Sequence, residues 1–419
     1  MTSNENQPTR LVNHSGFRWL WSGQTVSVLG SQFSNLALPV LAVTVLGATE
    51  WQMGILNAAS TAAFLLVGLI AGAWVDRWVK RKVMIVADLI RFLTLLAIPV
   101  LWWFHVLAIW QLFVVAAVTG LATVFFDVAS QSFIPVLMPK DKIGSANSAL
   151  ETSAQVAHVG GPSLVGFLIG LIQIPLLFLF DAISFAVSSA TLLRIKDHEV
   201  PASKEARAPL RQEIAEGIVF VVRQKLIRTI ALTTSTTNFF SNVLFTLLPL
   251  FILRTLSVPA TAFGFMMSMG AIGGLVGAAL TSRLIKWFGE GPVIVGSAIL
   301  SGLSICAVPL SAVLPQSMVI PLLITAEFVT SFTVLTYNIT QVTARQRLCP
   351  PELLGRMNAS IRFFVWGVMP LGSLLGGLLG ATIGVQITMW IGGIGSLVSA
   401  VFVTFSPLRK LREISSEAV

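Results

Sequence analysis

The segment GAWVDRWVKRK, residues 72–82, ends one long apolar run, residues 53–75, and continues as a charged loop to a second run, residues 83–104. Each run is long enough to cross a bilayer as an α-helix, which takes about 20 apolar residues. A short charged loop between two such runs indicates a membrane hairpin, and its basic residues favour the cytoplasmic side. The same alternation recurs along the chain, so this pattern decides the fold class.

The composition agrees with a membrane protein. The chain has 419 residues, of which 55% are hydrophobic and 11% charged, against about 25% charged in an ordinary soluble domain. Its mean hydropathy is +0.85. These values exclude a disordered chain, a nucleic-acid-binding domain and a typical soluble enzyme. The two cysteines, Cys306 and Cys349, do not support a disulfide framework.

The apolar runs predict an all-α membrane protein with twelve transmembrane helices in two pseudo-symmetric six-helix bundles. Because the runs are continuous, helices are favoured over the short alternating strands of a barrel. The expected spans are 17–46, 53–75, 83–104, 107–134, 144–171, 174–194, 226–253, 260–284, 291–313, 317–343, 353–381 and 385–406.

The basic residues predict the orientation. With an even number of spans, both termini lie on one side of the membrane. All but three of the 27 Lys and Arg residues then fall on that side or at span ends, the exceptions being Arg91, Arg254 and Arg362. The positive-inside rule makes this side the cytoplasm, in a plasma or inner membrane. The net charge of +9 therefore has a topological explanation and needs no nucleic-acid partner.

A hydrophilic stretch divides the chain into two halves. We expect one six-helix half at 1–195 and the other at 226–419, joined by a cytoplasmic linker at 196–225. Residues 210–224 within the linker have the pattern of an amphipathic helix on the inner membrane surface.

The two halves resemble each other in sequence. PKDKIGSANS from Pro139 and PPELLGRMNA from Pro350 align at an offset of 211 residues. The matched pairs are Pro139 and Pro350, Asp141 and Glu352, Gly144 and Gly355, Asn147 and Asn358, and Gly166 and Gly377. A parallel repeat of this kind is typical of secondary transporters, whose substrate site lies between the halves at mid-membrane.

The opening segment resembles the signature loop of the major facilitator superfamily, which is Gly, three residues, Asp-Arg, then Gly and a basic pair. The matching residues are Gly72, Asp76, Arg77, Lys80, Arg81 and Lys82, while Val79 replaces the second Gly. FRWLWSGQTVSVLG, ADLIRF, PELLGRMN and EIAEGIVFVVRQ resemble the branch of macrolide and enterobactin exporters. The resemblance implies that Asp76 closes a cytoplasmic gate by bonding near the start of helix 11, between Gly355 and Asn358. The alternative is that the basic residues serve topology alone.

The fifth span contains GGPSLVG, which resembles the Gly-Pro motif of the superfamily's exporters. Gly161, Pro162 and Gly166 match that motif, while Ala157 and Val165 replace glycines. Close helix packing by small residues, or a proline kink, is the alternative reading.

Polar stripes at helical spacing lie on spans 1, 4, 7 and 10, the helices that line the central cavity in the superfamily. The candidate cavity or substrate residues are Gln24, Ser27, Ser31, Asn35, Thr123, Asn238, Asn242, Ser331, Tyr337, Asn338 and Gln341. A helix facing only lipid would not carry such stripes, because polar groups are costly there.

Ionisable residues inside the spans each need a partner or a function. The candidate gating or structural charges are Asp88, Arg91, Glu151, Asp181 and Arg362, with Asp88 and Arg91 an i,i+3 pair. The candidate proton carriers are Glu327, Asp127 and His158, because a carboxyl group removed from water can bind a proton near neutral pH. A packing role is the alternative for His158. The arginine that proton-driven drug exporters carry in span 4 is missing here.

We therefore expect a secondary active exporter of amphipathic organic compounds such as a drug, a macrolide or a siderophore. Inward proton movement is the expected driving force, and the resemblance implies a monomer. The alternatives are an importer of a small solute and a transport-inactive sensor or assembly partner. The sequence contains no P-loop, HExxH or CxxC motif, so no enzyme activity, cofactor or metal is expected.

Overall fold

The computed structural model describes residues 14–75, 77–139, 142–196, 210–350 and 353–414. The first half contains α1 (Ser15–Thr44), α2 (Glu50–Val75), α3 (Lys80–Trp103), α4 (Ile109–Leu137), α5 (Ile143–Ile169) and α6 (Ile174–Leu193). The second half contains α7 (Leu210–Arg223), α8 (Lys225–Phe245), α9 (Leu248–Leu250), a π-helical turn (Phe251–Thr255), α10 (Ala260–Phe288), α11 (Glu290–Leu310), α12 (Gln316–Leu348), α13 (Leu354–Gly367), α14 (Met369–Ile383) and α15 (Val385–Thr404).

The structure confirms the all-helical membrane fold. In the described part of the chain, 11 helical segments are long and apolar enough to cross a bilayer. The one predicted span outside these 11 is the fifth, residues 144–171, which corresponds to α5 and has a polar first half with Ser145, Ser148, Glu151 and Gln155. Its 27 residues make a helix about 40 Å long. Like the other spans, this helix is packed within the bundle, and its neighbours are α1 and α10.

Two predicted spans are broken rather than continuous. Span 7 consists of α8, α9 and the π-helical turn, and span 11 consists of α13 followed by α14. Pro249 and Pro370 stand in the first turn after each break. Proline has no N–H and its ring clashes with the carbonyl four residues earlier, so each helix ends just before it.

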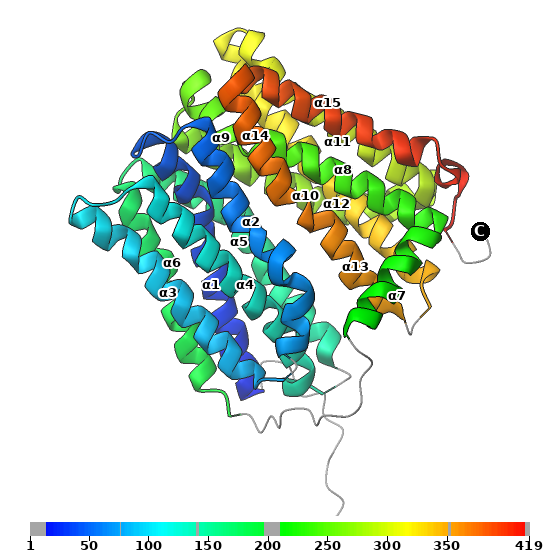
Figure 1. Ribbon diagram of the computed structural model, residues 1–419, viewed down its shortest axis with the longest axis horizontal. Helices are drawn as coiled ribbons and strands as arrows, with labels where there is room; N and C mark the ends of the chain where they lie inside the picture. Colours follow the sequence, from blue (N-terminus) through cyan, green and yellow to red (C-terminus); the bar gives the residue numbers. More distant parts are fainter. Residues whose placement is uncertain (1–13, 76, 140–141, 197–209, 351–352, 415–419) are drawn as a thin grey trace, which may run out of the picture.

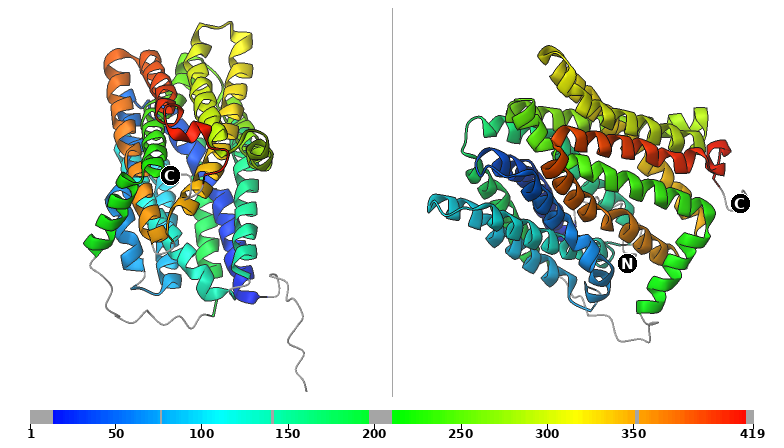
Figure 2. Two further views of the ribbon diagram at one scale, coloured as in Figure 1. Left: turned by 90° about the vertical axis from the view of Figure 1, so that its right-hand side faces the viewer. Right: turned by 45° about the horizontal axis from the view of Figure 1, so that its top comes forward.

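The helices form two bundles that converge at one end and diverge at the other (Figure 1). Within the first bundle α1 packs on α5 and α6, and α3 on α4 and α6. Within the second bundle α8 packs on α14 and α15, and α12 on α10 and α11. Contacts between the bundles run mainly through α2 with α14 and through α5 with α10. The right view of Figure 2 shows the same separation of the bundles.

The hydrophobic core explains why the bundles meet mainly at one end. A single buried cluster draws residues from both halves, including Phe33 and Leu41 of α1 together with Leu244 and Phe251 of the second half. We call this the closed end. At the opposite end, the open end, each half has its own separate cluster. Apolar burial stabilises contact between the halves at the closed end.

Paired glycines let the helices of opposite halves touch. A Cβ built on Gly54 of α2 would lie 2.9 Å from the Cα of Gly377 of α14, and one on Gly166 of α5 would lie 2.9 Å from the Cα of Gly264 of α10. Gly166 and Gly377 are the equivalent positions of the sequence repeat. The pseudo-symmetry predicted from sequence therefore places equivalent glycines at equivalent contacts between the halves.

Candidate transport cavity

A polar cavity of about 820 Å³ lies between the halves and reaches toward the open end. Helices α1, α4 and α5 supply most of its wall, and α13 supplies Arg362 from the other half. Of the predicted residues, Gln24, Ser27, Ser31, Asn35, Arg91, Thr123, Asp127, Glu151, His158 and Arg362 line it. Eleven of the 21 lining residues carry a hydroxyl or amide group, so the wall offers many hydrogen bonds beside apolar surface from residues such as Phe126 and Leu150.

Asp127 and Arg362 face the same space from opposite halves. Both side chains line the main cavity and also a neighbouring cavity of about 410 Å³ between α4 and α13. They lie close enough for their charges to interact, and Arg91 acts on Asp127 as well. Asp127 is exposed to the cavity. An acid and a base of opposite halves can therefore attract each other across the opening.

Glu151 and Arg362 are repeat equivalents, and the structure brings both to this cavity. Glu151 accepts a hydrogen bond from Gln155, with 2.6 Å between the oxygen and nitrogen atoms. His158 also lines the cavity with an exposed side chain. Besides Asp127, the cavity is thus lined by the carboxyl group of Glu151, the guanidinium of Arg362 and the imidazole of His158.

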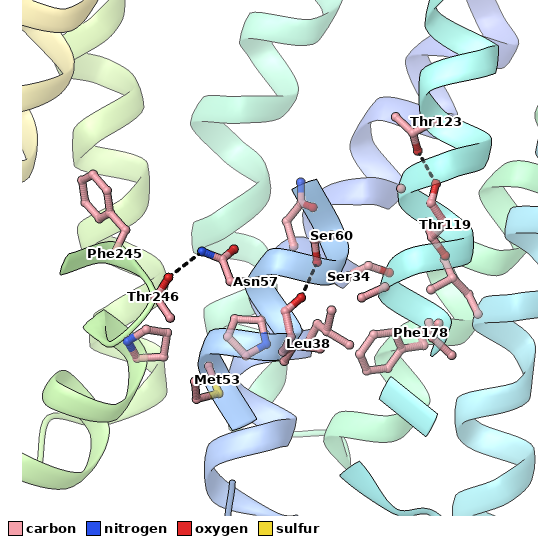
Figure 3. Close-up of a pocket in the computed structure, with 18 of the residues that line it drawn as sticks. Ser34, Leu38, Met53, Asn57, Ser60, Thr119, Thr123, Phe178, Phe245 and Thr246 are labelled. Atoms are coloured by element: carbon pink, nitrogen blue, oxygen red, sulfur yellow. Dashed lines mark hydrogen bonds between the residues drawn. The ribbon is translucent and has the colours of Figure 1, made fainter. Parts of the chain in front are cut away.

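A second chamber of about 370 Å³ lies nearer the closed end (Figure 3). Asn35 and Thr123 line both chambers. Asn57 of α2 donates to the hydroxyl of Thr246 at 2.9 Å and to that of Ser373 at 3.0 Å, so it bridges the halves. Asn57 was not among the predicted residues, because the polar stripes were sought on spans 1, 4, 7 and 10 and Asn57 lies on span 2. The sequence feature that indicates Asn57 is its amide side chain within the apolar run of span 2.

Arg91 is the centre of a buried charge cluster beside the cavity. It forms an ion pair with Asp88 at 2.5 Å, and its guanidinium lies 4.2 Å from the ring centres of both Phe126 and Phe185. Asp181, which accepts a hydrogen bond from a serine of its own helix, also interacts with this charge. Pairing and stacking stabilise the buried guanidinium, so Asp88 and Arg91 form a structural pair.

The predicted polar residues of the second half lie outside the lining of the main cavity. Tyr337 of α12 shares a hydrogen bond of 2.8 Å with Thr234 of α8. Asn238 donates to the carbonyl of Val365 at 2.9 Å. The others are Asn242, Ser331, Asn338 and Gln341, with Asn242 bonded within α8 and Gln341 bonded to Asn338. Tyr337 and Asn238 thus join helices of one half, whereas the bonds of Asn242 and Gln341 lie within their own helices.

Glu327 is also not brought to the cavity. A Cβ on Gly270 of α10 would lie 2.7 Å from its Cγ and 3.1 Å from the hydroxyl of Ser331. The stripe that contains Glu327 therefore faces α10 across a glycine. Sequence periodicity identified the polar face of this helix but not the neighbour that the face contacts.

The Gly-Pro motif of α5 faces two neighbours. A Cβ on Gly161 would lie 2.4 Å from Cγ of Gln32 of α1, while Gly166 faces Gly264 of the other half. Next to Pro162, the backbone N–H of Ser163 donates to the hydroxyl of Ser268 of α10 at 2.7 Å. The motif thus serves close packing both inside the first half and between the halves.

Comparison with known proteins agrees with this architecture. The family model described as Major Facilitator Superfamily matches residues 20–370 and 230–418. The chain belongs to the Major Facilitator Superfamily. It is therefore a secondary transporter and not an enzyme.

Two relatives of the superfamily cover nearly the whole chain. Macrolide efflux protein A of Streptococcus pyogenes is 21% identical over 402 residues, covering 95% of this chain and 97% of that protein. Multidrug efflux pump Tap of Mycolicibacterium fortuitum is 25% identical over 395 residues, covering 92% and 93%. A bacterial homologue of the iron transporter ferroportin, solved in an inward-facing state, superposes with a TM-score of 0.75 at 16% identity, covering 93% of this chain and 98% of that chain. The last similarity concerns the fold alone.

In this member of the superfamily, Arg254 ties the halves together at the closed end. Its guanidinium donates to the carbonyl of Ala48 at 2.8 Å and to that of Val43 at 2.7 Å. The carbonyl of Val43 lies in the last turn of α1, and that of Ala48 lies in the turn between α1 and α2. Arg254 belongs to the π-helical turn that ends span 7. The one basic residue expected on the far side of the membrane therefore has a structural partner in the opposite half.

The superfamily's signature loop lies at the open end. Asp76 is outside the described residues, so its predicted contact with the start of helix 11 stays a prediction. Arg81 donates a hydrogen bond to the carbonyl of Ile195. Arg77 and Lys82 are exposed. Gly72 and Lys80 lie at the ends of α2 and α3 that meet at this loop.

Proposed function

We propose that this superfamily member is a proton-coupled exporter of amphipathic organic compounds that are rich in hydrogen-bonding groups. The observation that carries the proposal is the polar cavity closed at one end, with Asp127 and Arg362 facing it from opposite halves. Two relatives are named for macrolide efflux and multidrug efflux, which supports export. A macrolide, another drug or a siderophore would offer the hydroxyl groups that this wall can bind.

The distribution of basic residues supports a cytoplasmic open end. The connection between α2 and α3, which carries Arg77, the first turn of α3, which carries Lys82, and helix α7, which ends at Arg223, lie at this end (Figure 1). The positive-inside rule places such residues in the cytoplasm. Both termini would then be cytoplasmic in a plasma or inner membrane. Substrate would enter the cavity from the cytoplasm or the inner leaflet.

Alternating access would follow from rocking of two units, residues 1–195 and 226–419, joined by the linker 196–225. Contacts at the closed end would break while the open end closes. One chain encloses the whole cavity, so we propose that it works as a monomer.

Asp127 and Arg362 suggest how a proton could drive this motion. With Asp127 ionised, its attraction to Arg362 favours closing the open end. A proton taken up from outside neutralises Asp127, removes the attraction and favours the inward-open state, where the proton is released. Each cycle would thus move a proton inward and substrate outward. Ligand and proton shift the equilibrium only through such differences between the two states.

The test measures accumulation of a fluorescent cationic dye and of a macrolide in energised cells, with and without a protonophore. We expect the intact protein to lower accumulation, and we expect either Asp127→Asn or the protonophore to restore it. Glu327→Gln is the matched control, a carboxyl-to-amide change outside the cavity, and should keep export.

Other outcomes would change the proposal. Loss of export in Glu327→Gln with retention in Asp127→Asn would move proton coupling to the α10–α12 contact. Higher accumulation in cells with the intact protein would favour an importer. No change with any compound, at normal membrane levels, would favour a sensor or assembly partner.

A further inference from the structure

A groove of about 670 Å³ lies between α3 and α4, away from the transport cavity. Its walls are apolar and come from residues spaced by three or four positions on each helix. They include Val83, Val86 and Ile90 of α3 and Val118, Leu121 and Phe125 of α4. Several of these side chains are open to the outside, Val86 with 55% and Leu121 with 41% of its surface exposed.

Cationic side chains stand at one end of this α3–α4 groove only. Arg77 and Lys82 line that end, at the level of the signature loop, and both are exposed. Trp78 lies beside them, and its ring centre is 6.4 Å from that of Phe125. Tryptophan with an apolar body and a polar N–H is typical of the membrane–water interface. The cationic end of the groove therefore lies at the level of lipid head groups.

The length of the groove fits one leaflet. Eight residues separate Lys82 from Ile90 along α3, a rise of about 12 Å. One leaflet contributes about 15 Å to the hydrocarbon core. A ligand with its charge at Lys82 would therefore place an apolar chain of nearly leaflet depth between the two helices.

We propose that the α3–α4 groove is a binding site for an anionic phospholipid. The phosphate lies between Arg77 and Lys82, and an acyl chain fills the apolar walls beneath. Charge complementarity selects an anionic head group, since basic pockets between transmembrane helices bind such lipids. The small side chains of Ala87 and Ala122, which line the groove and are buried, leave room for the chain at its floor. The proposal does not depend on the direction or substrate of transport.

Native mass spectrometry of the full chain, purified and stripped of lipid, tests the site. The probes are dioleoyl phosphatidylglycerol and dioleoyl phosphatidylcholine, titrated separately. We expect one high-affinity phosphatidylglycerol per chain, bound at least ten-fold more tightly than phosphatidylcholine. The double variant Arg77→Gln/Lys82→Gln should weaken phosphatidylglycerol binding about 10- to 30-fold.

Two further variants separate the groove from general charge and from misfolding. Arg409→Gln/Lys410→Gln removes the same charge from another exposed surface and should leave binding unchanged. Val86→Trp keeps both cations but fills the groove, and should also lose the tight phosphatidylglycerol. Equal affinity for the two lipids, equal loss in both double variants, or full binding in Val86→Trp would each overturn the proposal.

Discussion

At the scale of single residues, the most demanding feature is the guanidinium of Arg91. It is 5% exposed, and three acids, Asp88, Asp127 and Asp181, interact with it. One positive charge cannot balance three buried carboxylates. The cluster is therefore stable only when some of the three acids are protonated or face the cavity. Asp127 is the acid that faces it. This arrangement separates the buried structural pair of Asp88 and Arg91 from a carboxyl that faces the cavity.

Arg91→Met should destabilise the protein by about 3–5 kcal/mol, because it leaves the buried carboxyl of Asp88 without its cation. Thermal unfolding of the purified protein measures the change. The double variant Asp88→Leu/Arg91→Met should recover much of the loss, since no buried charge remains unpaired. A single variant as stable as the wild type would show that the pair contributes little.

The proposed role of Asp127 as proton carrier predicts that substrate drives proton release. With Asp127→Asn, substrate-driven proton release by the purified protein in proteoliposomes should vanish, while substrate binding falls less than ten-fold. A pH-sensitive dye inside the vesicles measures the released protons. Proton release equal to that of the wild type would exclude Asp127 as the carrier.

At the scale of elements, close helix contacts depend on glycine. Gly54 with Gly377, and Gly166 with Gly264, allow backbone contact between α2 and α14 and between α5 and α10. Small residues at such crossings permit packing that larger ones prevent, because transmembrane helices associate largely through close contact.

Gly264→Ala should reduce transport about 5- to 100-fold. Its Cβ would lie 2.6 Å from the carbonyl oxygen of Pro162 and 2.7 Å from the Cα of Gly166, and overpacking of this kind costs about 1–3 kcal/mol. Gly54→Ala should have a similar effect at the equivalent contact.

Gly296→Ala of α11 is the control for these glycine variants. No atom lies within 4 Å of a Cβ at that position, so transport should stay at the wild-type level. Export assays at matched membrane levels make the comparison. If all three variants behaved alike, helix propensity rather than contact between the halves would explain the glycines.

At the scale of the whole molecule, the structure is one of the two states that alternating access requires. The shared core cluster and Arg254 hold the closed end, and the separate clusters leave the other end open. A transporter must be able to exchange these contacts, so no single contact should dominate the equilibrium.

Arg254→Gln should shift the population toward the state open at the opposite end. It removes two hydrogen bonds from a charged donor, each worth about 1.5–3 kcal/mol. A single cysteine, introduced as Asn35→Cys after Cys306 and Cys349 are replaced by Ser, reports which end of the cavity is open. Labelling by an impermeant thiol reagent from the closed end should increase.

Arg283→Gln is the matched control, an exposed arginine of α10 at the other end of the molecule. Labelling of Asn35→Cys should not change in that background. Unchanged labelling in Arg254→Gln would show that apolar burial alone holds the closed end.

The sequence by itself determined the membrane fold, the helices and the repeat. Apolar runs of bilayer length leave the chain few alternatives, because every backbone polar group in lipid must be bonded within a helix or a closed barrel. Local chemistry also predicted the ion pair of Asp88 and Arg91, which are one turn apart, and the glycines of the repeat.

Only the tertiary structure decided which polar residues meet. Helical spacing identifies a polar face, but the neighbour of that face depends on how the helices cross. Hence Asp127 faces the cavity and Arg362, whereas Glu327, on an equally polar stripe, packs against Gly270. Asn57 bridges the halves across 189 residues of sequence. Contacts of that range arise from packing of whole helices, which no local pattern encodes.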